Sequence, residues 1–173
     1  LIKINPYNYA YLTFTGNCYY ALGKFDLADN YCNKVLKIYP EYGWAKILKS
    51  KIETEKQNYI VALDWIQSSV NYIKGVQFNG FTHYLQKIII YKHLNDKEKI
   101  QEIILELKSK LGYREFHSYL FQACFIAEDY KEAKLHLLSF LEEKNVHIWI
   151  DPTIPHIWES EFGQIIKTSL NID

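Results

Sequence analysis

The sequence predicts an all-α protein made of stacked antiparallel helix pairs, and three observations lead to this fold class. Apolar residues recur at helical spacing through most of the 173 residues. Prolines occur only at Pro6, Pro40, Pro152 and Pro155, so residues 41–151 contain no proline to interrupt a helix. A short phrase of sequence also recurs at a fixed distance, which is the signature of a repeat architecture.

The helical periodicity is clear around residue 100. Ile100, Ile103, Ile104 and Leu107 form an apolar stripe at i, i+3, i+4 and i+7. Stripes of this kind, separated by asparagine or glycine at intervals, predict eight helices in the body of the chain. They span residues 7–22, 25–38, 43–56, 59–73, 79–94, 97–110, 114–127 and 130–143.

The repeat is most visible at the start of the chain. Residues 1–6 (LIKINP) return 34 residues later as residues 35–40 (VLKIYP). The unit between them contains a pattern of small and aromatic residues at Gly16, Tyr19, Phe25 and Ala28. This pattern resembles the tetratricopeptide repeat, a pair of antiparallel helices about 34 residues long. Leu12 and Thr15 replace the tryptophan and leucine that are usual in that family.

The resemblance implies a role for each of these residues. Gly16 would be the small residue between closely packed helices, and Ala28 would lie where the two helices of the pair cross. A glycine within a helix costs about 1 kcal/mol relative to alanine, which is tolerated where two backbones approach closely. Gly23 stands at a helix end, where a left-handed cap residue is wanted. Stacked as in the family, the pairs would form a right-handed superhelical solenoid.

The later units are weaker copies of the first. The Phe25/Ala28 column returns as Tyr59/Ala62, then as Lys97/Ile100, and finally as Tyr130/Ala133. We therefore expect a single domain of four helix pairs, at residues 7–42, 43–76, 77–112 and 113–147. Residues 1–6 would be the tail of a preceding repeat, and a longer turn would surround Gly75 to Gly80. Because the chain starts at Leu1 and contains no methionine, we expect it to be a fragment of a larger protein.

Residues 148–173 are predicted to close the array. Asp151-Pro152 opens a stretch that resembles the DP-containing loop and short helix at the end of bacterial arrays. A capping helix over residues 156–169 would cover the last pair, whose apolar face is otherwise exposed. Its apolar side would consist of Ile154, Ile157, Trp158, Phe162, Ile165, Ile166 and Leu170. The alternative is that this aromatic-rich tail is a docking peptide for another protein.

Composition argues against nucleic-acid binding and against membrane insertion. The chain carries 20 basic and 20 acidic side chains, and Arg114 is its single arginine. Proteins that bind a nucleic-acid backbone normally carry an excess of basic residues on one face. Short apolar runs such as residues 88–91 fall far short of the roughly 18–20 residues that span a bilayer.

The sequence contains no pattern typical of a catalytic, cofactor-binding or metal-binding site, so we expect neither an enzyme nor a cofactor. Cys18, Cys32 and Cys124 lack CxxC spacing. We expect Cys18 and Cys32 to be buried free thiols in a reducing, cytoplasmic compartment. A disulfide or a reactive thiol is the alternative. The six histidines form no i, i+4 pair and no HExxH motif, which disfavours zinc.

The family resemblance also implies that the first helix of each pair lines an inner groove. The positions facing it would combine aromatic anchors with amides and lysines, as in protein-binding surfaces. They include Thr13, Asn17, Tyr20, Trp44, Ile47, Lys51, Leu85, Ile89, Gln122 and Phe125. Trp44 and Tyr20 are the predicted anchors. The competing interpretation is an ordinary half-exposed scaffold surface, in which Trp44 packs against Tyr7 or Tyr42.

These patterns favour a non-catalytic module for protein–protein or peptide interaction, a fragment of a larger bacterial protein. Its partner would be a protein or peptide, with no nucleic acid and no membrane; the sequence specifies neither the partner nor an oligomeric state. A second possibility is a sensory or regulatory repeat domain that gates an enzyme or DNA-binding domain absent from this chain. A helical-repeat RNA binder is disfavoured, because it would need a basic inner face.

Overall fold

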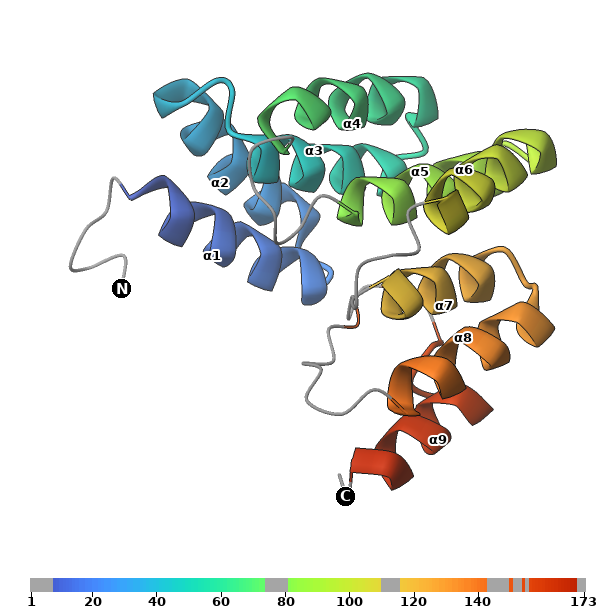
Figure 1. Ribbon diagram of the computed structural model, residues 1–173. Helices are drawn as coiled ribbons and strands as arrows, with labels where there is room; N and C mark the ends of the chain where they lie inside the picture. Colours follow the sequence, from blue (N-terminus) through green and yellow to red (C-terminus); the bar gives the residue numbers. More distant parts are fainter. Residues whose placement is uncertain are drawn as a thin grey trace. The chain divides into compact units, whose positions relative to one another are not determined.

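The computed structural model describes residues 8–73, 81–109, 116–142, 150, 154 and 156–170. All regular secondary structure in these residues is α-helical (Figure 1). The chain divides into two compact units, residues 1–94 and residues 95–173. Within the described residues, no helix is both long and apolar enough to cross a membrane. The predicted fold class, an all-α helical repeat, is confirmed.

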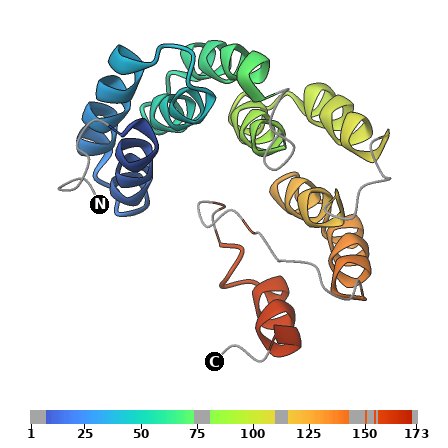
Figure 2. The ribbon, with the colours of Figure 1, turned by 60° about the vertical axis from the view of Figure 1, so that its left-hand side comes forward.

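The first unit contains two and a half helix pairs. Its helices are α1 (Tyr9–Ala21), α2 (Phe25–Ile38), α3 (Gly43–Glu55), α4 (Tyr59–Ile73) and α5 (Thr82–His93). Each helix contacts the next one along the chain, and α3 also contacts both α1 and α5. Figure 2 shows the same succession from α1 to α5 in blue to green. The first helices of consecutive pairs therefore lie side by side, which is the packing pattern of stacked helix pairs.

The second unit contains α6 (Lys97–Ser109), α7 (Phe116–Ile126), α8 (Tyr130–Glu142) and α9 (Glu161–Leu170). Here too each helix contacts its successor. The boundary between the units falls after Leu94, between the two helices of the predicted 77–112 pair. The right-handed sense of the superhelix stays a prediction, and residues 1–6 and the expected turn at Gly75 to Gly80 lie outside the described residues.

Helix starts at residues 25, 43, 59, 97 and 130 agree with the sequence prediction. Four of these starts, at residues 25, 59, 97 and 130, come two residues after a turn residue with a left-handed backbone. The turn residues Gly23, Gln57, Asn95 and Glu128 all adopt a left-handed backbone, with φ between 56° and 69°. These four residues occupy the same column of the repeat. A left-handed residue reverses the chain directly after a helix, so each pair becomes antiparallel.

Three of these turns share the same pair of backbone hydrogen bonds. After α1, the amide of Gly23 donates to the carbonyl of Tyr20 at 2.9 Å, and that of Lys24 donates to Tyr19 at 2.9 Å. The turns after α3 and α7 repeat both bonds at equivalent positions. This is the Schellman motif, which satisfies carbonyls that a helix end leaves open.

The two helices of the first pair meet closely at Gly16. A Cβ atom on this residue would lie 2.8 Å from Leu48 Cδ2 and 3.5 Å from the backbone oxygen of Ala28. Ala28 is itself completely buried. The expected roles of both small residues are confirmed, because a Cβ at Gly16 would press on the Leu48 side chain of α3 and would also contact α2.

A network of charges joins α2 to α3 in the first unit. Lys49 Nζ lies 2.5 Å from Asp29 Oδ1 and 3.7 Å from Glu53 Oε1, and Lys56 Nζ lies 3.3 Å from Asp29 Oδ2. Burial raises the pKa of Asp29, but the two ammonium groups more than offset this, so the pKa lies below its ordinary value. The network therefore favours the charged form of Asp29 and fixes the second helix of one pair to the first helix of the next.

The capping helix starts later than predicted. Residues 156–160 form a turn rather than the first turn of a helix, and α9 begins at Glu161. His156 has a left-handed φ of 59°, which a helix does not accommodate. Ser160 then supplies the cap, because its Oγ accepts a hydrogen bond of 3.4 Å from the amide of Gly163.

The packing of the cap follows the predicted apolar pattern. Ile157, Phe162 and Ile166 are buried, and the Phe162 ring lies 5.7 Å from the ring of Phe121 on α7. A Cβ on Gly163 would lie 2.4 Å from the carbonyl oxygen of Trp158. The helix and the preceding turn are therefore in direct backbone contact, which only glycine permits here.

The left-handed turns give a test of the repeat geometry. Replacing Gly23→Ala should lower the free energy of unfolding by about 1 kcal/mol, because a Cβ is strained at this φ although no atom crowds it. Replacing Gln57→Gly should raise it by up to about 1 kcal/mol for the same reason. Urea unfolding followed by circular dichroism measures both. Two changes of the same sign would contradict this account.

A second test concerns the cap. Replacing Phe162→Ala should lower the free energy of unfolding by about 3 kcal/mol or more, because a buried phenylalanine leaves a cavity against Phe121. Gln164→Ala, an exposed change on the same helix, is the control and should have little effect. An unchanged urea midpoint for Phe162→Ala would favour the alternative in which the tail is a docking peptide.

Candidate functional site

The first helices of the first unit bring polar and aromatic side chains together. Tyr20 lies near the end of α1 and is half-buried. Its hydroxyl donates a 2.8 Å hydrogen bond to Glu55 Oε1 at the end of α3. The ammonium group of Lys51, one turn earlier on α3, lies 6.0 Å from the centre of the Tyr20 ring. We call Tyr20, Lys51, Glu55 and the nearby Asn17 the tyrosine site.

The geometry of the tyrosine site follows from the local structure. Tyr20 comes three residues before Gly23, and its ring packs at 5.5 Å against Phe25, the first residue of α2. Contacts on two sides hold the ring in place, while Asn17 and Glu55 remain exposed. The site therefore presents an amide, a phenol, an ammonium and a carboxylate from two adjacent helices.

A buried polar strip continues from α3 to α5. The amide nitrogen of Gln86 donates to Thr54 Oγ1 at 3.0 Å, and Thr54 Oγ1 donates to the carbonyl of Ser50 at 2.9 Å. Ser50 Oγ donates in turn to the carbonyl of Ala62 on α4 at 2.8 Å. Gln86, Thr54 and Ser50 are all buried. These bonds satisfy polar groups inside the stack, so the strip aligns the helices rather than offering a binding surface.

The predicted groove residues differ widely in accessibility. Asn17 is exposed, and Tyr20, Trp44 and Ile89 are half-buried. The other predicted groove residues are buried, namely Thr13, Ile47, Lys51, Leu85, Gln122 and Phe125. The structure brings Tyr20 and Lys51 into contact, with Asn17 on the turn of α1 before Tyr20, whereas Gln122 and Phe125 belong to the second unit. Both predicted anchors keep some exposure, so their role in binding stays a prediction.

Trp44 also has a structural role. It packs against the core cluster that contains Tyr42 and Leu48, and against the next cluster, which contains Ile47 and Ala62. The ring therefore lies at the joint between the first and second helix pairs. This position agrees with the competing interpretation in part, because Trp44 contributes to packing while part of its surface stays accessible.

The thiols differ from the sequence prediction at one position. Cys32 and Cys124 are buried, but Cys18 is exposed. The prediction for Cys18 was wrong because the buried side of α1 runs through Leu12 and Gly16, and a residue two positions after Gly16 faces the other way. Burial raises the pKa of both the Cys32 and the Cys124 thiol to about 12. Neither is a thiolate at neutral pH, so neither is suited to nucleophilic catalysis.

Sequence reasoning missed a histidine pair in the second unit. His117 Nδ1 on α7 lies 3.1 Å from His136 Nδ1 on α8. The two are 19 residues apart, and only the packing of α7 on α8 joins them, so no local spacing signals the contact. His136 is buried, and Glu132 on the same helix is paired with Lys108 Nζ of α6 at 2.6 Å. Burial, followed by the neighbouring His117, lowers the pKa of His136.

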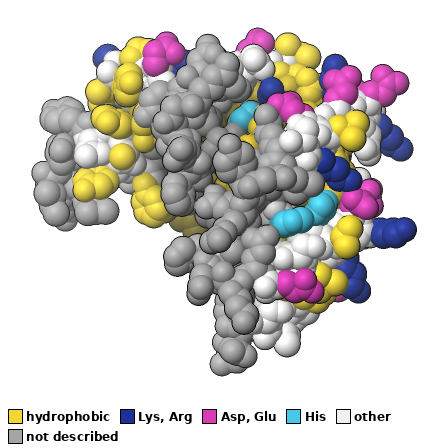
Figure 3. All heavy atoms as spheres, viewed as in Figure 1, with side chains coloured by type: hydrophobic (Ala, Val, Ile, Leu, Met, Phe, Trp, Pro, Cys, Tyr) yellow, Lys and Arg dark blue, Asp and Glu magenta, His cyan; other side chains and the backbone are white. Residues whose placement is uncertain are grey.

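The described residues offer no group of three or more histidine, cysteine, aspartate or glutamate side chains placed to hold a metal ion. Charges of both signs are interspersed over the described residues on the face shown in Figure 3. Comparison with protein-family models finds no match to this chain. Comparison with curated proteins finds no match either.

The histidine pair predicts a pH-dependent stability. Because the pKa of His136 is lowered in the folded state, the unfolded chain takes up the proton more readily. Stability should therefore be lost as pH falls through the ordinary histidine value of about 6.5. His136→Gln should reduce this loss in urea unfolding between about pH 7.5 and about pH 5.5. Leu138→Ala, an exposed change on the same helix, should leave the pH dependence unchanged.

A pH dependence that is identical in the parent and in His136→Gln would contradict this assignment. The comparison uses the slope of stability against pH rather than stability itself, because replacing a buried histidine also changes packing.

Proposed function

We propose that the chain is a non-catalytic interaction module that binds a peptide or protein segment at the tyrosine site. In this proposal it is a tetratricopeptide-like segment of a larger cytoplasmic protein, as its sequence pattern suggests. The observation that carries the proposal is the position of Tyr20. It is a rigid aromatic side chain, held by Phe25 and Glu55 and still accessible, on the side of the stack formed by the first helices.

The chemistry around Tyr20 suits a polypeptide ligand. A peptide backbone presents both donors and acceptors, and the site offers groups of both kinds. Asn17 supplies an exposed amide that can donate and accept, the exposed carboxylate of Glu55 accepts, and the hydroxyl of Tyr20 can do both. The ring of Tyr20 supplies apolar area at low cost in conformational entropy, and Trp44 supplies a second ring at the opposite end of α3. The site is thus suited to binding an extended segment with an apolar side chain.

Two further observations support a binding module over an enzyme. The thiols of Cys32 and Cys124 have a pKa of about 12, which disfavours thiolate chemistry. The buried side chains of Gln86, Thr54 and Ser50 form hydrogen bonds that connect three helices, so their polar groups stabilise the helix packing. A rigid scaffold of this kind lowers the entropy that a binding site loses when its ligand binds.

The experiment starts from a displayed library of random peptides, selected on the whole chain. Tyr20→Ala and Trp44→Phe are then compared with Phe14→Ala for binding of the selected peptides by calorimetry. Phe14 is the matched control, because it is an exposed aromatic residue on another side of the same helix. Tyr20→Ala should weaken binding by about 30-fold, the equivalent of about 2 kcal/mol for an anchor residue.

Trp44→Phe keeps most of the packing at the joint, so it should weaken binding by a smaller factor while the unfolding midpoint changes little. Failure of the selection to yield any peptide would contradict the proposal. So would selected peptides whose affinity falls with Phe14→Ala and not with Tyr20→Ala, since their site would then be elsewhere on α1.

A further inference from the structure

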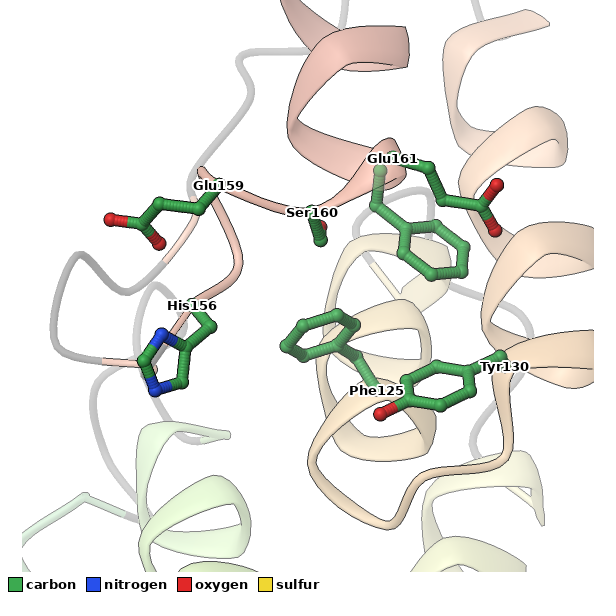
Figure 4. A pocket seen from close by; sticks show the side chains of 7 residues that line it. Phe125, Tyr130, His156, Glu159, Ser160 and Glu161 are labelled. Carbon is green, nitrogen blue, oxygen red and sulfur yellow. The ribbon is translucent and has the colours of Figure 1, made fainter.

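The second unit contains a hollow where the cap meets the last helix pair (Figure 4). Phe125 at the end of α7, Tyr130 at the start of α8 and Phe162 in the first turn of α9 form its apolar part. Its volume is about 330 Å³, near the lower end of the roughly 300–1,000 Å³ typical of ligand pockets. A space of this size accommodates one long side chain.

Three aromatic rings pack against one another beside this space, and the rings of Tyr130 and Phe162 lie 6.1 Å apart at an angle of 31°. The centre of the Phe125 ring lies 5.9 Å from that of Tyr130 and 5.6 Å from that of Phe162, and both contacts are edge-to-face. Phe125 and Phe162 are buried, whereas Tyr130 is 51% exposed. The rings therefore form a partial aromatic cage that is firm at its base and accessible at Tyr130. The electron-rich faces of such rings attract a cation.

Carboxylates predominate among the charged groups described around the cage. Glu159 and Glu161 line the hollow, and the described residues of its lining also include His156 but no lysine or arginine. Among the described residues, no ion pair joins either carboxylate to a basic side chain. Figure 4 shows the two carboxylates on opposite sides of the hollow, directed outward. They create a negative potential at the entrance, where the ring of Tyr130 is accessible.

The first unit contains an equivalent pair of aromatic residues at the same positions of the repeat. Tyr20 and Phe25 flank the turn after α1 as Phe125 and Tyr130 flank the turn after α7, and the ring centres are 5.5 Å and 5.9 Å apart. Beside Tyr20, the first helix of the next pair, α3, supplies a cation, the ammonium group of Lys51. Beside Phe125 the next element is the cap, which contributes carboxylates to the hollow.

We propose that this hollow binds the side chain of an arginine or lysine presented by a partner segment. The cation would lie against the exposed ring of Tyr130, with Glu159 and Glu161 at the entrance. An apolar side chain is a poorer occupant, because it would gain nothing from the negative potential of the two carboxylates. This site is separate from the tyrosine site, so neither proposal depends on the other.

The test is a titration of the isotope-labelled full chain, monitored by nuclear magnetic resonance. The probes are N-acetyl-arginine methylamide and N-acetyl-lysine methylamide, with the uncharged N-acetyl-citrulline methylamide as the matched control ligand. We expect at least one of the charged probes to cause saturable shifts at Tyr130, Glu161 and Phe162. The dissociation constant should be of the order of millimolar, as for a single side chain. Citrulline should bind at least about fivefold more weakly.

Two sets of variants locate the site. Glu159→Gln combined with Glu161→Gln changes only exposed side chains, so the fold is retained, and it should weaken binding at least about fivefold. Tyr130→Ala should weaken it by a similar factor. Tyr39→Ala and Glu98→Gln, an exposed tyrosine and an exposed glutamate outside the hollow, should leave binding unchanged.

Equal binding of citrulline and arginine would overturn the proposal, since the charge would then be irrelevant. Absence of saturable shifts with both charged probes would overturn it as well, as would unchanged binding in the double glutamine variant. Because the tyrosine site is tested with selected peptides and with changes in the first unit, failure of one proposal is distinguishable from failure of the other.

Discussion

Ala28, Ala62 and Ala133 are each completely buried at the same position of three helix pairs, and this close crossing constrains the rest of the fold. At the first crossing, a Cβ on Gly16 would lie 3.5 Å from the backbone oxygen of Ala28. At the second crossing, the side chain of Ser50 donates a hydrogen bond to the carbonyl of Ala62. The buried alanines let the two helices of each pair pack closely at these crossings.

The left-handed turn makes this crossing possible. Its position, five residues before the alanine column, is occupied by Gly23, Gln57, Asn95 and Glu128. Only one of the four is glycine, so at three turns a side chain adopts a backbone that costs about 1 kcal/mol or more. We interpret this as a local cost that the packing of each pair offsets. The same turn places an aromatic pair on either side of it, Tyr20 with Phe25 and Phe125 with Tyr130.

Both candidate sites follow from that aromatic pair and differ in what packs next to it. In the first unit, α3 adds Lys51 and Glu55, so the ring of Tyr20 has a cation and an acceptor as neighbours. In the second unit, the cap adds Phe162 and two glutamates, so the ring pair lies beside a negatively charged hollow. One repeat geometry thus supports two recognition surfaces of different chemistry, because each surface depends on the element that follows.

The all-helical class, most helix starts and the roles of Gly16, Gly23 and Ala28 could be predicted from the amino-acid sequence, because they depend on local spacing and on backbone sterics that a glycine or alanine reveals. The start of the cap was predicted too early, since no side-chain pattern indicates the left-handed backbone of His156. Cys18 was predicted to be buried, because a helix of low amphipathicity such as α1 gives little indication of its buried side. The accessibility of the predicted groove residues, and the contacts of His117 with His136 and of Phe162 with Phe125, follow from tertiary packing alone. These contacts link residues from different helices, and their distances are set by how the helices pack rather than by their separation in the chain.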